Sequence, residues 1–257
     1  MKPGAARIDY RTEWLIAESA ARVPVTGVLR EMRQSYAIED RDVVELGSGI
    51  GTNLQVFVPG NRVRGVEGMA EAVAEAQRRG IATAQADLDG PLDLPDASAD
   101  WVLCIDVLEH LQRPATCLDQ ARRILRADGR LVINVPNHFD WRGRLRIALG
   151  SGIDSQRYFP DSPHWEYPHL RFFQRASIEA LLRSCGFAVE TDYSGRNCTL
   201  PRSRQLARLG LGPALAWLAL RRPDLFSAGF FLVCRKADGA AGIQSGPGAA
   251  SGAASGG

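Results

Sequence analysis

The fold of this chain is decided by the stretch Asp42-Val43-Val44-Glu45-Leu46-Gly47-Ser48-Gly49-Ile50-Gly51-Thr52. A short apolar run ends at an acidic residue, a glycine-rich turn follows, and polar residues begin a helix. This order is typical of the strand–loop–helix start of a nucleotide-binding α/β unit. Gly47 and Gly49 allow a tight turn and a close approach to a ligand, because neither carries a Cβ atom. The free N–H groups at the helix start would point at that ligand.

The spacing of the glycines indicates which ligand binds. A dinucleotide fingerprint, G-x-G-x-x-G, needs a glycine where this chain has Thr52, whereas the spacing here is G-x-G-x-G with Glu45 in front. A carboxylate there would repel a pyrophosphate but not a ligand that carries an ammonium and a sulfonium group. Glu67 ends the next apolar run, about twenty positions after Gly47, where an acid suits the two hydroxyls of a ribose. A nicotinamide oxidoreductase is therefore disfavoured.

With these motifs the sequence resembles the class I S-adenosylmethionine-dependent methyltransferases, whose first motif reads E/D-x-G-x-G-x-G. The segment Asp106-Val107-Leu108-Glu109-His110-Leu111 is similar to the post-strand motif of the group in which V-L-E-H is common. The resemblance implies a Rossmann-like fold, S-adenosyl-L-methionine as the cofactor, and an enzyme that methylates a small molecule or a glycan or lipid precursor.

Composition restricts the class of protein further. The chain has 257 residues, long enough for one α/β domain with insertions. Its net charge of +2 gives no reason to expect a nucleic-acid partner. Five cysteines form no C-x-x-C pair and mostly lie in apolar runs, and the N-terminus lacks the apolar run of a signal peptide. We therefore expect a cytoplasmic protein.

Strands and helices alternate along the chain, which predicts an α/β, Rossmann-like, seven-stranded and mostly parallel sheet with helices on both faces. Insertions are expected after strands five and six. The predicted strands are 43–46, 63–67, 81–86, 101–105, 130–135, 187–193 and 229–234, and predicted helices include 53–58 and 176–185. The predicted domains are N-terminal covering helices over 1–39, a methyltransferase domain over 40–236 with insertions 137–174 and 194–227, and a disordered Gly/Ala/Ser tail over 237–257.

The carboxyl ends of the predicted parallel strands carry four acids, Glu45, Glu67, Asp87 and Asp106. In open α/β sheets, ligands bind at the edge where the carboxyl ends of the strands lie. The alternative is that such acids only cap the following helices. The resemblance implies that Glu67 binds the ribose hydroxyls, that Asp87 and Leu88 contact adenine, and that Met69 packs on the adenine, although a core methionine is an equal alternative. The predicted cofactor-binding residues are Glu45, Gly47, Ser48, Gly49, Gly51, Glu67, Gly68, Met69, Asp87, Leu88, Asp106 and Val107.

The catalytic requirement is modest, because the cofactor carries an activated methyl group and the protein mainly aligns the reactants. A base is needed only when the nucleophile must lose a proton. His110 is the predicted catalytic residue, and its alternative role is to bond to the backbone and shape the loop.

Insertion 137–174 is rich in aromatic residues, arginine and histidine, and is too long for an ordinary connection. We expect it to form a lid facing the acceptor; a packed cover without a catalytic role is the alternative. No metal site is expected, because none of its three histidines forms a helical i, i+4 pair. The residues predicted to contact the acceptor are Asn137, His138, Trp141, Tyr158 and His169.

A second reading comes from the start of this insertion. Pro136–Leu145 is similar to the P-N-F-x-x-W-x-x-R-L segment of MetW-like proteins of methionine biosynthesis, and Asp87–Gly90 is similar to their D-L-D-x-G stretch. This resemblance allows an alternative function, a cofactor-binding accessory protein that activates a homoserine acyltransferase.

The apolar run Leu209–Leu220 has twelve residues, too few to span a bilayer. Arginines flank it on both sides, which suits a surface with anionic headgroups. Three interpretations stay open: the run packs on the sheet, binds a partner protein, or contacts a membrane peripherally.

Overall fold

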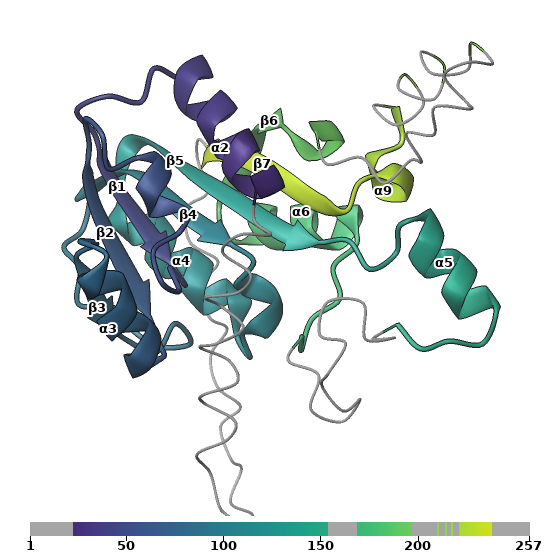
Figure 1. Cartoon of the computed structure of the whole chain (residues 1–257), viewed down its shortest axis with the longest axis horizontal. Helices are drawn as coiled ribbons and strands as arrows, with labels where there is room; N and C mark the ends of the chain where they lie inside the picture. The colour runs from purple at the N-terminus through teal and green to yellow at the C-terminus, as the bar shows by residue number, and fades with distance from the viewer. Residues whose placement is uncertain are drawn as a thin grey trace, which may run out of the picture.

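A seven-stranded sheet with the strand order β3-β2-β1-β4-β5-β7-β6 forms the centre of the molecule (Figure 1). In this computed structural model the described residues are 23–153, 169–196, 210, 214, 217 and 221–237. The strands are β1 (Asp42–Leu46), β2 (Arg62–Glu67), β3 (Thr83–Gln85), β4 (Ala99–Ile105), β5 (Leu125–Pro136), β6 (Phe187–Asp192) and β7 (Gly229–Lys236).

The sheet is parallel from β3 to β5, and β7 runs antiparallel to both of its neighbours. This arrangement confirms the predicted Rossmann-like, mostly parallel, seven-stranded fold. The parallel strands therefore end at one common edge of the sheet, and the loops that follow β1, β2, β4 and β5 lie there.

Helices cover both faces of the sheet, as predicted (Figure 1). Neighbouring strand residues point to opposite faces, so Val43 belongs to the core on the α2 face and Val44 to the core on the α4 and α6 face. The helices are α2 (Val23–Ser35), α3 (Ala70–Arg78), α4 (Pro114–Ile124), α5 (Trp141–Ala148), α6 (Arg175–Ser184) and α9 (Pro223–Phe226). Three 3₁₀ turns join them, η1 (Leu54–Val56), η2 (Leu108–His110) and η4 (Ser194–Arg196).

Two sequence predictions need correction. The helix expected over 53–58 is only the 3₁₀ turn η1, where Phe57 N–H bonds to the Leu54 carbonyl at 2.8 Å and Pro59 follows within a turn. Strand β5 begins at Leu125 rather than at residue 130, because Leu125 pairs with Ala99 of β4 ahead of a register shift, and the pairing resumes between Arg130 and Trp101.

The insertion after β5 contains a helix that the sequence did not predict. Asp140 caps the start of α5 by accepting a hydrogen bond from Gly143 N–H at 2.8 Å. The helix has no buried residue and stands away from the sheet (Figure 1). Among the described helices, none is both long and apolar enough to cross a bilayer.

Several predictions concern residues outside the described part of the chain. These are residues 1–22 of the N-terminal segment, Tyr158 and His164 of the insertion, most of Leu209–Leu220, and residues 238–257 of the tail. The domain boundaries and the nature of the tail therefore stay predictions.

Leucine truncations test the contrast between the core and α5. Leu182 in α6 is fully buried, so Leu182→Ala should lower the free energy of unfolding by about 2–5 kcal/mol. Leu145 in α5 is 51% exposed, and Leu145→Ala should change it by no more than about 0.5 kcal/mol. Denaturant unfolding of both variants gives the comparison. An equal loss in the two would show that α5 packs on the core.

Candidate functional site

The glycine loop after β1 requires glycine at defined positions. Gly47 and Gly51 have φ of 77° and 80°, a region that other residues rarely adopt. A Cβ atom on Gly47 would overlap the Val107 side chain, and one on Gly51 would press on Ile81. The loop is therefore packed directly against the residue that follows Asp106, which brings two predicted cofactor-binding segments into contact.

Glu67 at the end of β2 holds this loop. Its carboxylate accepts a hydrogen bond from Gly49 N–H at 2.8 Å and another from Met69 N–H at 3.0 Å, at the start of α3. A carboxylate has about four acceptor sites, so two remain for hydroxyl groups. Gly68 is exposed and Met69 is half-buried, both beside this carboxylate. The arrangement fits the ribose contact that the sequence predicts for Glu67.

Glu45 lies beneath the loop. It is fully buried, and Asn53 Nδ2 donates to its Oε1 at 2.8 Å. Ser48 is buried as well, and its side chain lies against Gly65 of β2. Contact between Glu45 and the methionine part of a cofactor stays a prediction. Asn53 was not among the predicted site residues, although a polar residue directly after a glycine loop can indicate such a contact.

Asp87 and Leu88 follow β3 and have different surroundings. Asp87 is exposed and accepts from Asp89 N–H at 2.9 Å, whereas the Leu88 side chain is buried in the core. Asp89 was missed as a structural residue: its carboxylate accepts from Gln112 N–H at 3.0 Å and Arg113 N–H at 2.6 Å. This turn is thereby joined to the segment that starts α4.

Asp106 directly follows β4 and has a strained conformation. Its φ is 52°, a left-handed value that is unfavourable for a residue with a side chain and tends to occur at functional sites. Asn134 on β5 holds it, donating from Nδ2 to Asp106 Oδ1 at 2.6 Å and accepting from Asp106 N–H at its carbonyl at 2.9 Å. Asn134 was not predicted as a site residue. The role of a polar residue inside an apolar strand cannot be predicted before the residue on the neighbouring strand is known.

Three predicted site histidines meet at the same edge of the sheet. His169 Nδ1 lies 2.9 Å from His138 Nε2, and the ring centroids of His169 and His110 are 4.8 Å apart. His138 and His169 are buried, while the His110 side chain is 34% exposed. His110 and His138 follow neighbouring parallel strands, and residue 169 returns to them from the end of the insertion.

Burial controls the charge of this cluster. Burial, with smaller contributions from the neighbouring His110 and His138, lowers the pKa of His169 from its ordinary value of 6.5 to about 2. His169 is therefore neutral at physiological pH. The oxygen or nitrogen donor atoms of Glu109, His110 and His169 also lie within 4.8 Å of one another. These three side chains come from two separate segments, so the spacing of histidines along one helix does not predict whether they can hold a metal.

The other predicted acceptor residues have structural contacts. Asn137 is fully buried, and its amide donates to the carbonyls of Asp224 and Ser227 at 2.8 and 3.0 Å. It therefore anchors the end of β5 to the α9–β7 connection. Trp141 begins α5, and the Arg142 guanidinium lies 5.5 Å from the centre of its ring. Contact of either residue with an acceptor stays a prediction.

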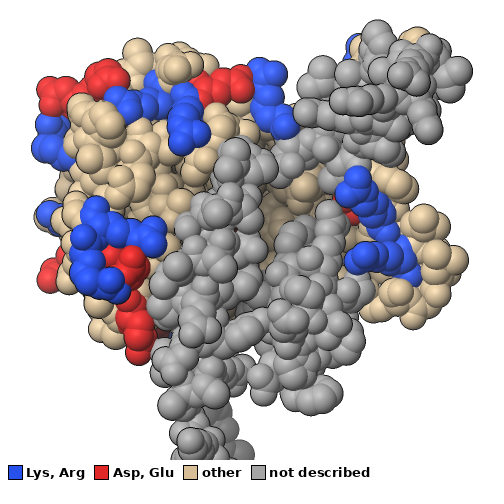
Figure 2. Space-filling view, in the orientation of Figure 1, with Lys and Arg blue, Asp and Glu red and all other residues tan. Residues whose placement is uncertain are grey.

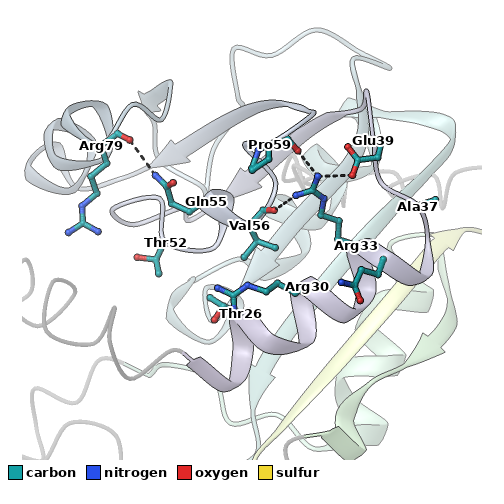
Figure 3. A pocket seen from close by; sticks show the side chains of 11 residues that line it. Thr26, Arg30, Arg33, Ala37, Glu39, Thr52, Gln55, Val56, Pro59 and Arg79 are labelled. Atoms are coloured by element: carbon teal, nitrogen blue, oxygen red, sulfur yellow. Dashed lines mark hydrogen bonds and ion pairs between the residues drawn. The ribbon is translucent and has the colours of Figure 1, made fainter.

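A cavity of about 920 Å³ lies between α2 and the region after the glycine loop (Figure 3). Arg30, Thr52 and Gln55 are among its lining residues, and Arg33 donates there to Glu39 and to the Pro59 carbonyl. None of the predicted cofactor-binding residues lines it. The cavity is therefore distinct from the edge that carries the strand-end acids.

Comparison with known proteins agrees with this geometry. A family model described as a methyltransferase domain matches residues 21–192. A probable S-adenosylmethionine-dependent methyltransferase of Mycolicibacterium smegmatis is 30% identical over 161 residues, 62% of this chain and 56% of that protein. One of Mycobacterium tuberculosis is 32% identical over 150 residues, 57% of this chain and 48% of that protein. The chain thus spans about half the length of these relatives.

Solved structures share the fold at low sequence identity. A methyltransferase of Thermotoga maritima that depends on S-adenosylmethionine superposes with a TM-score of 0.54 at 21% identity, covering 70% of this chain and 77% of that one. The [4+2]-cyclase SpnF gives 0.55 at 16% identity, covering 83% and 80%. Since one of these catalyses a cyclisation, the fold alone does not define the reaction. The family match covers most of the chain, and the chain therefore belongs to the methyltransferase domain family, in the S-adenosylmethionine-dependent class that its motifs predicted.

Proposed function

We propose that this protein transfers a methyl group from S-adenosylmethionine to a hydroxyl group of a small-molecule or glycan or lipid-precursor acceptor. The observation that carries the proposal is the histidine cluster at the sheet edge that also bears Glu67 and the glycine loop. A hydroxyl nucleophile must lose its proton, and imidazole is the side chain best suited to accept one near neutral pH.

Residues on one side of this sheet edge bind the cofactor, and residues on the other side bind the acceptor. Glu67 binds the ribose hydroxyls of the nucleoside while it holds Gly49 N–H and Met69 N–H in place. The cofactor supplies an activated methyl group. On the other side, the histidine cluster positions the acceptor oxygen in line with that methyl and takes up its proton.

His110 is the best candidate for the base. His169 is too weak a base, because burial holds its pKa at about 2. His138 is buried, and its Nε2 is engaged with His169. His110 is the member of the cluster with an exposed edge, so an acceptor can reach it.

Helix α5 supports an amphipathic acceptor. It exposes Leu145 and Leu149 and carries Arg142, Arg144 and Arg146. Figure 2 shows basic side chains over the region of α5 with little acidic surface around them. An apolar surface beside guanidinium groups suits an apolar chain with a negatively charged group, as in a lipid-linked precursor. Leu209–Leu220, mostly outside the described residues, is a further candidate for peripheral membrane or partner contact.

Labelled cofactor and extracted acceptors test the proposal. With deuterated-methyl S-adenosylmethionine and fractions of polar metabolites and lipids, we expect labelled product and an equal amount of S-adenosylhomocysteine. His110→Asn should lower kcat by about 10²–10⁴-fold and leave the affinity for S-adenosylhomocysteine unchanged. Cofactor binding without turnover on any fraction, with co-purification of an acyltransferase, would instead support the accessory function.

The cofactor side gives a second prediction. Glu67→Ala removes the acceptor for the ribose and for two loop N–H groups, and should weaken S-adenosylhomocysteine binding by about 1.5–3 kcal/mol in calorimetry. The matched control is Glu71→Ala, which removes the same charge from an exposed position in the first turn of α3. If the two variants bind equally well, Glu67 does not belong to the site.

The neutral state of His169 predicts a pH dependence of stability. Below pH 6.5 the unfolded chain binds a proton at this residue that the folded chain does not, so stability falls as pH drops from 6.5 towards 2. His169→Gln should remove a loss of about 1.3 kcal/mol between pH 7.5 and 5.5. Denaturant unfolding at both pH values, with EDTA present, measures it. Equal slopes for the wild type and the variant would show that His169 titrates normally.

A further inference from the structure

Glu109, His110 and His169 form a cluster of side chains that could ligate a metal, and none of them is among the predicted cofactor-binding residues. One ligand atom from each lies within 4.8 Å of the other two. Glu109 and His110 come from η2, directly after β4, and His169 comes from the end of the insertion. The cluster therefore exists only in the folded chain.

Backbone contacts hold the two segments together. The Glu109 carbonyl accepts hydrogen bonds from Leu170 N–H at 2.8 Å and Arg171 N–H at 3.0 Å. The Arg171 guanidinium donates to the Gln112 carbonyl at 2.7 Å. His169 is thus fixed beside η2 by its two following neighbours, and the ligand atoms are brought near one another before anything binds.

A second layer orients His169. Its Nδ1 lies 2.9 Å from His138 Nε2, and the His138 ring packs edge-on against Phe172 with centroids 4.9 Å apart. When one ring nitrogen of a histidine donates to a neighbour, the tautomer is fixed and the other nitrogen keeps a lone pair for a ligand. His138 would thus be the residue that directs His169 Nε2 towards a metal.

The donor set selects the type of metal. Two imidazoles and one carboxylate suit zinc and the similar first-row divalent ions, whereas magnesium and calcium prefer oxygen ligands alone. Three protein ligands leave at least one coordination position open, as in catalytic zinc sites. Ligand atoms in such a site lie about 3.4 Å apart, so the observed spread closes with side-chain shifts of about 1 Å. Glu109 is buried, and a divalent cation would offset the desolvation of its charge.

We propose that Glu109, His110 and His169 bind a divalent transition-metal ion, with His138 as the residue that positions His169. The inference rests on the proposed function for its use: the open position would take the acceptor hydroxyl and lower its pKa. The hydroxyl proton leaves to solvent, the oxygen forms a bond to the methyl carbon, and the carbon–sulfur bond breaks with its electron pair going to sulfur. With the metal bound, His110 serves as a ligand and the metal activates the hydroxyl; without it, His110 is the base of the proposed function.

Titration of the metal-free full chain with Zn²⁺ by calorimetry, and with Co²⁺ by visible absorption, tests the site. The wild type should bind one equivalent of metal, and its Co²⁺ form should show the intense visible bands of a four-coordinate site. Glu109→Gln and His169→Asn should each weaken binding by more than about 100-fold, and His138→Asn by about 10–100-fold. The control is Asp96→Asn, an exposed carboxylate paired with Arg123, which should bind like the wild type.

Glu109 and His169 are buried, so their variants could fail to fold. His110 is partly exposed, and His110→Asn tests the same site without that risk. Weakened binding in this variant, with an unchanged melting temperature, supports the site. Binding equal to the wild type in both His110→Asn and Glu109→Gln would show an adventitious surface ion and overturn the inference. Binding of S-adenosylhomocysteine and methyl transfer in EDTA, measured separately, would leave the proposed function standing without the metal. Metal binding by a protein that transfers no methyl group would support the metal site and contradict the proposed function.

Discussion

The bridge made by Glu67 is the interaction on which the cofactor side of the site depends. Its carboxylate ties the Gly49 N–H of the first loop to the Met69 N–H of the next one. Two adjacent parallel strands therefore present their loops in one fixed arrangement. The carboxylate that fixes both loops is also the group proposed to accept from a ribose, so the geometry of the loops and that of a bound nucleoside would be coupled through one side chain.

The side proposed to bind the acceptor depends on a comparable constraint at the ends of β4 and β5. Asp106 keeps a left-handed backbone because Asn134 bonds to both its side chain and its N–H group. That turn directs the chain into η2, where the Glu109 carbonyl holds the end of the insertion. The strain at Asp106 is thus balanced by bonds from the neighbouring strand, and it places His110 beside His169.

The two halves also explain how one fold serves different reactions. The predicted cofactor half is built around the glycine loop and Glu67, and the family match, residues 21–192, covers both halves. The half proposed to bind the acceptor contains two buried histidines, His138 and His169, and the partly exposed His110 of a 3₁₀ turn. Solved structures of the same fold at low identity include a methyltransferase and a cyclase, which is expected when chemistry is set by such added segments.

Local patterns determined much of this protein. The alternation of apolar strands and helices predicted the sheet, and the glycine spacing with Glu67 predicted the cofactor edge, because both depend on short-range periodicity and backbone conformation. The turn at 54–56 and the early start of β5 were misjudged, since hydrogen bonds to neighbouring segments set those boundaries. The contacts of Asn134 with Asp106, and of His169 with His138 and His110, could be decided only by the tertiary structure. Their partners are distant in sequence, and no local propensity records which buried polar groups will meet when the strands align.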